Sequence, residues 1–291
     1  MNHANFHIGE LRATIGNNAA HQEHRAGYNG LWSLTYGSSK RSLFVPAYAG
    51  LNHEHIFNGE SDAPREIFFE PRHAEMEFRL ISENKCELYQ PPTPTFQLES
   101  WTQFHFLEPH YIDITYRCIA RQHTFPHGYI GLFWASYINA PEDKSMYFSG
   151  NQQGSNDDLW CQLCTPIHND KSTVPHKDDA LSLPFREGHR NALFRNISPF
   201  RYHTPFYFGL FQQYMWIVMF DRTQGIRFTH SPSGGGTNSL YQTTNPAWDY
   251  QFLIPEFQLD QTYQFSMRAI LRPRCTREEI MEEYVRWQSE K

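Results

Sequence analysis

Hydrophobic and polar side chains alternate along much of this chain with the two-residue period of a half-buried β-strand. In the segment 261–268 (QTYQFSMR), Tyr263 and Phe265 lie on one face of such a strand, whereas the polar residues between and after them lie on the other. Segments of this kind recur, and Gly, Pro, Asn or Ser residues bound most of them. The pattern predicts a protein built almost entirely from antiparallel strands.

The predicted strands share either this alternation or a dense content of β-branched and aromatic residues. They cover residues 31–36, 41–45, 74–81, 85–89, 96–107, 111–121, 129–137, 145–150, 159–163, 207–209, 214–221, 226–230, 248–254 and 261–271. The first two are separated by the turn Gly37-Ser-Ser and are therefore typical of a β-hairpin. So many strands in one chain favour a sandwich or a barrel.

The two ends of the chain follow different patterns. Residues 1–27 are polar and have no clear period, so we expect an N-terminal arm that is either loose or an edge strand. Near the other end, Thr276-Arg-Glu-Glu279 is a capping box, and the apolar residues after it have helical spacing. We therefore predict a helix over 276–288 that belongs to a single β-sandwich domain, residues 28–291.

Three stretches interrupt the strand pattern: residues 52–72, 165–204 and 231–247. Long irregular loops are uncommon in compact domains, and those that occur are usually functional. We therefore expect the functional site to be built from these loops.

Composition and charge narrow the class of protein. Aromatic residues make up 16% of the 291 residues, which is enough for a large aromatic-rich core. The net charge is −6 and the basic residues are scattered, so we expect no nucleic-acid partner. The sequence contains neither a signal-peptide pattern nor an apolar run of about 18 residues. We expect a cytoplasmic protein that does not insert into a membrane.

The 16 histidines raise the question of a metal site. His168, Asp170 and His230 follow the ligand order of a 2-His-1-carboxylate iron site, which occurs in jelly-roll (double-stranded β-helix) proteins. A metal-dependent jelly-roll oxygenase with a divalent metal is therefore an alternative interpretation. The arginine that would bind the co-substrate of such an enzyme is missing from the stretch 231–247. We accordingly expect no metal and no other cofactor.

Carbohydrate binding is the chemistry that the remaining side chains favour. Sugars present apolar C–H faces beside hydroxyl groups, so their sites combine aromatic surfaces with polar side chains. The segments 133–139 (FWASYIN) and 245–249 (NPAWD) have this mixture. The predicted substrate contacts are His53, His55, Arg72, Trp134, Asn139, His230, Trp248 and Asp249. The carboxylates considered for acid/base chemistry are Glu54, Glu70, Glu108, Asp113, Asp249 and Glu256.

Several short segments occur in a distinctive order. They are Gly30-Leu-Trp-Ser-Leu34, Leu43-Phe-Val-Pro46, His53-Glu-His55, Ala135-Ser-Tyr-Ile-Asn139, Phe252-Leu-Ile-Pro-Glu256 and Leu259-Asp-Gln-Thr-Tyr263. Across about residues 28–272 this order resembles the galactose mutarotase-like (aldose 1-epimerase) superfamily, where the fourth segment is His-Ser-Tyr-Phe-Asn. The resemblance implies a large antiparallel β-super-sandwich with a carbohydrate ligand.

The resemblance also implies a pair of groups that open the sugar ring by acid/base catalysis. Glu256 would be the base, and His55 would bind the sugar. The acid of the family falls on Ala135, which cannot donate a proton. The base of the family also precedes a proline directly, whereas here Pro255 precedes the glutamate.

Another histidine would have to supply the missing acid. His110, His168 and His176 are the candidates, and we assign the role to His176. The sequence thus predicts a protein that binds a small-molecule carbohydrate in an open cleft and modifies it by acid/base chemistry. As an enzyme it would be an epimerase or isomerase, a lyase or a hydrolase. A non-catalytic sugar-recognition module is a further alternative, and the sequence does not indicate an oligomeric state.

Overall fold

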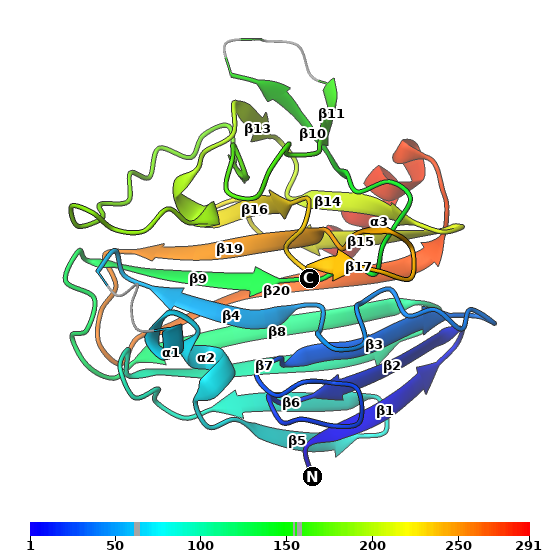
Figure 1. Cartoon of the computed structure of the whole chain (residues 1–291), viewed down its shortest axis with the longest axis horizontal. Coiled ribbons are helices and arrows are strands. Elements are labelled where there is room, and N and C mark those ends of the chain that lie inside the picture. Colours follow the sequence, from blue (N-terminus) through cyan, green and yellow to red (C-terminus); the bar gives the residue numbers. More distant parts are fainter. Residues whose placement is uncertain (61–64, 154, 156–158) are drawn as a thin grey trace.

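Antiparallel strands dominate the computed structural model, which describes residues 1–60, 65–153, 155 and 159–291 (Figure 1). Residues 61–64, inside the stretch 52–72 that we expected to be irregular, lie outside the described residues. The described strands form sheets of ten, five, three and two strands.

The largest sheet has ten strands, and all its neighbours pair antiparallel. Its order is β11 (Leu159–Leu163), β10 (Met146–Gln152), β14 (Phe206–Phe211), β15 (Tyr214–Phe220), β20 (Thr262–Pro273), β8 (Tyr111–Ala120), β7 (Leu98–Leu107), β6 (Lys85–Gln90) and β5 (Glu77–Ser82). A further strand, β13 (Phe200–Tyr202), pairs with β10.

The smaller sheets are also antiparallel. The five-stranded sheet has the order β12 (Thr173–Pro175), β16 (Ile226–Ser231), β19 (Ala247–Pro255), β9 (Tyr129–Ala135) and β4 (Asn52–Phe57). The three-stranded sheet contains β1 (His3–Ile8), β2 (Leu11–Gly16) and β3 (Gly30–Tyr36), and a two-stranded ribbon contains β17 (Thr237–Asn238) and β18 (Thr243–Thr244). The helices are α1 (Arg65–Phe68), α2 (Glu70–His73), the 3-10 helix η1 (Leu193–Arg195) and α3 (Arg277–Ser289).

The main hydrophobic core lies between the ten-stranded sheet on one side and the five- and three-stranded sheets on the other. Strand β8 shows why its sequence alternates. Ile112, Ile114 and Tyr116 point into the core and are buried, whereas Thr115 and Arg117 are exposed. Burial of one face and hydration of the other is the physical origin of the two-residue period.

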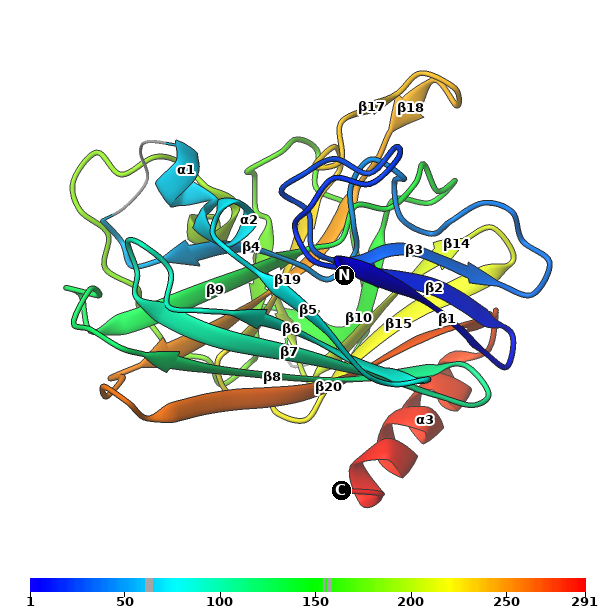
Figure 2. The same cartoon turned by 90° about the horizontal axis from the view of Figure 1, so that it is seen from below.

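The five-stranded sheet is buried on both faces, so its strands are apolar without clear alternation. All seven residues of β9 are buried. Trp134 belongs to the main core, whereas Phe133 belongs to a second apolar cluster on the outer face. Figure 2 shows α1 and α2 over this outer face, near β4 and β9. These helices and the segment 181–194 cover the outer face of the sheet.

Helix α3 packs on the outer face of the ten-stranded sheet, on the opposite side of the molecule from α1 and α2 (Figure 2). Thr276 and Glu279 form the predicted capping box, and Ile280 and Trp287 contact the sheet. The predicted C-terminal helix is therefore confirmed. It is 13 residues long, and no helix in the described part of the chain is long and apolar enough to cross a membrane.

The predicted all-β super-sandwich with one short C-terminal helix is confirmed, and the jelly-roll alternative is wrong. A jelly roll has eight strands in two sheets, whereas one sheet alone contains ten strands here.

The structure also bears on three local expectations, two of which are wrong. Residues 41–45 are not the second strand of a hairpin, because β3 pairs with β2 instead. Part of the expected N-terminal arm, residues 3–16, forms β1 and β2, and β1 is an edge strand. Residues 52–57, which we expected to be irregular, form strand β4. All six residues are buried, but the polar side chains among them do not give the pattern of a buried strand.

Candidate functional site

A β-bulge in β4 separates the two histidines of the segment His53-Glu-His55. His53 pairs with Trp134 of β9 and His55 with Phe133, so Glu54 is the extra residue of the bulge. In a regular strand residues i and i+2 share one face, but a bulge redirects the side chains that follow it. His53 consequently points into the main core, and Glu54 and His55 both point to the outer face.

Glu54 is buried and lies at the centre of a polar cluster. Its Oε1 lies 2.9 Å from Nε2 of His55, and its Oε2 accepts hydrogen bonds from the Tyr137 hydroxyl and, at 3.1 Å, from Nδ2 of Asn52. Burial alone would raise the pKa of Glu54. The neighbouring charges of His55 and Arg72 and the hydrogen bonds outweigh burial and lower this pKa, which favours the carboxylate.

The tautomer of His55 follows from its contacts. Its Nδ1 lies 2.8 Å from the carbonyl oxygen of Phe68, which can only accept, so Nδ1 carries a proton. Its Nε2 faces the Glu54 carboxylate, and these two groups can therefore share one proton. The outer face of β4 thus holds a buried carboxylate–imidazole pair in direct contact.

Arg72 is held beside this pair by α2. Its Nη1 lies 3.7 Å from Oε2 of Glu54, its Nε donates to the Gly27 carbonyl at 2.5 Å, and its guanidinium stacks on the Tyr28 ring at 3.9 Å. The preceding Glu70 accepts hydrogen bonds from the backbone N–H groups of residues 95 and 96, which fixes α2 in place. The cluster therefore contains a fixed positive charge next to its carboxylate.

These groups line a cavity of about 290 Å³ on the outer face of the five-stranded sheet, which we name the Glu54 cavity. That volume is close to the lower limit for small-molecule sites. Aromatic side chains form much of its wall. The lining residues are Tyr28, Glu54, His55, Phe68, Phe69, Arg72, Phe133, Tyr137, His168, Asn169, Arg190, Asn191, Ala192, Leu193, Phe194 and Gly234.

His168 is a second titratable group in the wall of the Glu54 cavity. Its Nδ1 lies 2.8 Å from the Ser231 hydroxyl, and its Nε2 makes no hydrogen bond to any described residue. Burial lowers the pKa of His168, and the Glu54 carboxylate opposes that effect. The neutral imidazole that results at neutral pH can accept a proton and return it.

Of the predicted substrate contacts, the structure brings His55 and Arg72 together in this cavity. It places three others in the core, with their aromatic faces covered. His53 stacks on Trp134 at 4.8 Å between ring centroids, and Trp248 is fully buried with its indole N–H bonded to the Lys144 carbonyl. These rings pack against the ten-stranded sheet rather than facing a ligand.

Asn139 and His230 have protein partners. The Asn139 side chain bonds to Ser42 and Asn238. His230 is fully buried, with Nδ1 next to Thr165 and Nε2 next to the Lys144 carbonyl, and its pKa is lowered to about 4 by burial.

These contacts bear on the alternative metal set, His168, Asp170 and His230. Both ring nitrogens of His230 are engaged by the protein, so it is not arranged as a ligand. Across residues 1–60, 65–153, 155 and 159–291, no group of three or more His, Cys, Asp or Glu side chains is placed to hold a metal ion.

Asp249 lies beneath the cavity region, on the outer face of β19. Its Oδ1 accepts the backbone N–H of Ser136 at 2.9 Å, and its buried Oδ2 makes no hydrogen bond to a described residue. Burial raises the pKa of Asp249 well above its usual value, and the nearby Glu54 raises it further. Burial therefore favours the neutral acid form of Asp249.

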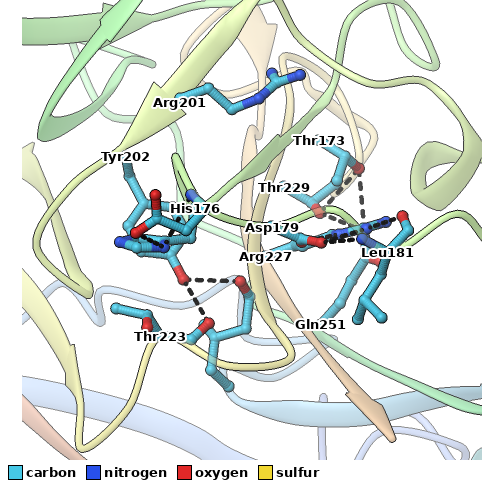
Figure 3. Close-up of polar contacts among 12 residues, drawn as sticks. Thr173, His176, Asp179, Leu181, Arg201, Tyr202, Thr223, Arg227, Thr229 and Gln251 are labelled. Carbon is cyan, nitrogen blue, oxygen red and sulfur yellow. Dashed lines mark hydrogen bonds and ion pairs between the residues drawn. The ribbon is translucent and has the colours of Figure 1, made fainter. Parts of the chain in front are cut away.

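The two residues predicted to be catalytic lie away from the Glu54 cavity. Glu256 is exposed beyond the end of β19, where its N–H donates to the Gly128 carbonyl. Glu256 lies five residues along the chain from the position of β19 that pairs with Phe133. At the rise of a β-strand this separation is roughly 16 Å. His176 lines a different cavity, next to Asp178 and Tyr202 (Figure 3).

Sequence reasoning gave weak signals for the other residues of the site. Glu54 was among the carboxylates considered, and Tyr137 lies within the segment 133–139 that we singled out, but neither was assigned to the site. Tyr28 and Phe194 come from irregular segments far apart in the chain and carried no recognisable signal.

Comparison with known proteins adds information on the fold. No protein-family model and no curated protein matches the sequence. Among solved structures, a candidate aldose 1-epimerase from Escherichia coli K12 superposes with a TM-score of 0.57 at 9% identity, over 94% of this chain and 99% of that one. A galactose mutarotase-like protein from Lactobacillus casei ATCC 334 gives a TM-score of 0.49 at 7% identity, over 93% of this chain and 100% of that one.

The strand order and the polar cavity define an antiparallel β-super-sandwich with a candidate acid/base site on the outer face of its smaller main sheet. More particularly, the chain has the galactose mutarotase-like fold, as the order of its short sequence segments predicted. At 9% identity the likeness extends to the fold alone.

Proposed function

We propose that the protein binds a sugar or sugar derivative in the Glu54 cavity and transfers protons to and from it. The observation that carries this proposal is the position of two titratable groups, Glu54 and His168, in the wall of one cavity lined by aromatic rings. Aromatic rings suit the C–H face of a sugar, and the polar groups suit its hydroxyls.

The cluster also suits acid/base chemistry. Glu54 would act as the base, because its neighbours keep it in the carboxylate form. His168 would exchange a proton with another position of the ligand through its Nε2. Arg72 would stabilise negative charge that develops on a ligand oxygen. Epimerisation, isomerisation and β-elimination all use such a set of groups.

The sharpest test separates binding from turnover. Saturation-transfer NMR would measure the binding of a panel of monosaccharides, and ¹H NMR in D₂O would follow deuterium incorporation or product formation. Glu54→Gln should retain binding and reduce turnover by at least ~100-fold, in the range of general acid/base catalysis. Glu142→Gln removes one exposed carboxylate that does not line the Glu54 cavity and serves as the matched control.

Three results would contradict this proposal in whole or in part. Sugar binding that survives Tyr137→Phe, Arg72→Gln and Phe194→Ala unchanged would exclude the Glu54 cavity as the binding site. Turnover that is lost in Glu256→Gln but kept in Glu54→Gln would favour the assignment implied by the resemblance. Binding without any turnover in the wild type would leave a sugar-recognition module.

A further inference from the structure

A second cavity adjoins the Glu54 cavity on the outer face of the five-stranded sheet. Its volume is about 340 Å³, and we name it the Arg227 cavity. Phe194 lines both cavities, so the short helix η1 forms the wall between them. The Arg227 cavity contains three arginines, Arg195, Arg201 and Arg227, and a single carboxylate, Asp179.

Arg227 is the fixed element of this cavity (Figure 3). Its side chain is only 4% exposed. Its Nε and Nη2 bind the two oxygens of Asp179 at 2.7 and 3.0 Å, and Nη2 also donates to the Leu181 carbonyl at 2.7 Å. Its Nη1 has no hydrogen-bond partner among the described residues. The buried guanidinium is thus held rigidly, with one N–H edge unused.

The strands beneath Arg227 are linked to one another by side-chain hydrogen bonds. The amide nitrogen of Gln251, on β19 opposite Arg227, donates to the hydroxyls of Thr173 and Thr229 at 3.0 and 2.8 Å (Figure 3). The side chain of Asp179 is buried, with 6% exposed, and its carboxylate is already engaged in the ion pair with Arg227. No carboxylate in the described lining remains for the other two arginines.

Arg201 and Arg195 are oriented by backbone oxygens instead of by acids. Nη1 of Arg201 donates to the carbonyls of Ser198 and Phe200, both at 2.8 Å, and Nη1 of Arg195 donates to the His189 carbonyl at 2.5 Å. Neither guanidinium has an ion-pair partner among the described residues. The pKa of Arg201 is lowered, mainly by burial. Asp179 raises this pKa and Arg227 lowers it further, so the three groups are close enough to interact.

The charge of the Arg227 cavity is therefore positive, although the whole chain carries a net charge of −6. An excess of guanidinium groups that are already oriented is a site for an oxyanion, because the planar N–H groups match the oxygens of a carboxylate or sulfate. Carbonyl anchoring fixes these groups in advance, so less side-chain entropy is lost on binding.

We propose that the Arg227 cavity binds the carboxylate or sulfate group of an acidic saccharide whose neighbouring sugar ring occupies the Glu54 cavity. This inference rests on the proposed function, because it takes the Glu54 cavity as the sugar site. It narrows the ligand from sugars in general to acidic sugars and their oligomers. Arg195, Arg201 and Arg227 are its specificity-determining residues.

Isothermal titration calorimetry with matched ligands tests this inference. The ligands are D-galacturonate and D-glucuronate, their neutral counterparts D-galactose and D-glucose, short oligomers of each, and sodium sulfate alone. The variant is Arg195→Gln with Arg201→Gln, which leaves the buried Arg227 in place. The control is Arg79→Gln with Arg117→Gln, which removes the same charge from β5 and β8 of the ten-stranded sheet.

We expect the affinity for the acidic ligands to be roughly tenfold higher, or more, than the affinity for the neutral ones. One or two charge-assisted hydrogen bonds give a difference of this size. The Arg195/Arg201 variant should lose this difference and keep the affinity for neutral sugars. Sulfate should compete with the acidic ligand in the wild type and in the control, but not in the variant.

Equal affinity for acidic and neutral sugars, or an equal loss of both in the variant, would overturn the inference and leave sugar binding in the Glu54 cavity intact. Arginine-dependent binding of sulfate without binding of any sugar would overturn both the acidic-saccharide assignment and the proposed function.

Discussion

The two faces of the five-stranded sheet are made by the same strands but have opposite chemistry. On the inner face, Trp134, Trp248 and Tyr250 pack with the ten-stranded sheet and are essentially inaccessible. On the outer face, the neighbouring positions of these strands and of β4 carry Glu54, His55 and Asp249, beside two cavities. The difference shows that the tryptophans of these strands build the core, whereas the site combines charged residues with a wall of Phe and Tyr rings.

The largest effect should come from truncating the inner face. Trp134→Ala removes a fully buried indole that contacts His53, Tyr116 and Tyr250. We expect the free energy of unfolding to fall by roughly 3–5 kcal/mol. Urea denaturation followed by circular dichroism measures it, and Trp134→Phe should lose less. A loss below about 1 kcal/mol for the alanine variant would mean that Trp134 faces a cavity and not the core.

Charge removal on the outer face should have a smaller effect on stability. Glu54→Gln keeps the shape of the side chain but leaves His55 and Arg72 without their counter-charge. We expect the free energy of unfolding to fall by about 1–3 kcal/mol, the range for hydrogen bonds to charged groups. The same denaturation assay measures this change. A stability loss as large as that of Trp134→Ala would assign Glu54 a mainly structural role.

The two faces should also respond to pH with opposite signs, and His53 reports on the inner one. Burial lowers the pKa of His53 to about 3, and the nearby His55 adds to this shift. The unfolded chain binds this proton more tightly, so the contribution of neutral His53 to the free energy of unfolding is fully present above about pH 6.5 and is lost as the pH decreases toward 3. At pH 5 the loss relative to neutral pH is roughly 2 kcal/mol. His53→Leu should therefore show a shallower loss of stability between pH 7 and pH 5 than the wild type does. An unchanged slope would contradict the burial of this imidazole.

Asp249 on the outer face should respond to pH with the reverse sign. Its pKa is raised in the folded protein, so its contribution is complete below the unfolded pKa near 3.8 and is lost as the pH rises through the folded value. Asp249→Asn mimics the neutral acid. The melting temperature of this variant should exceed that of the wild type at pH 7, and the difference should vanish near pH 4. A lower melting temperature at pH 7 would mean that the ionised carboxylate is the stable form.

The fold could be predicted because strand periodicity and helix capping are local. Strand β8 alternates over its whole length, and Thr276 and Glu279 specify the start of α3. Strand β4 was missed because its sequence, NHEHIF, is polar although all six residues are buried. Several of its polar groups bond to partners distant in the sequence, such as Tyr137 for Glu54 and Phe68 for His55, which a local pattern cannot reveal.

The site was less predictable for two physical reasons. Alternation would place His53 and His55 on one face, and only the bulge at Glu54 puts them on opposite faces. In addition, β9 and β19 are buried on both sides, so composition could not show which aromatic residues face a ligand. The assignments of Glu256 and His176 remain predictions, and the structure places both outside the Glu54 cavity.

The bulge in β4 also affects how such a protein can diverge. A single inserted position separates residues that maintain the core from residues that line the Glu54 cavity, although they are adjacent in the sequence. Substitutions at Glu54 or His55 can change the chemistry of the cavity while His53 and Trp134 continue to hold the sheets together. The lining of the cavity can therefore differ between related chains without changes in the inner layer, and the segment around this bulge is the place to compare them.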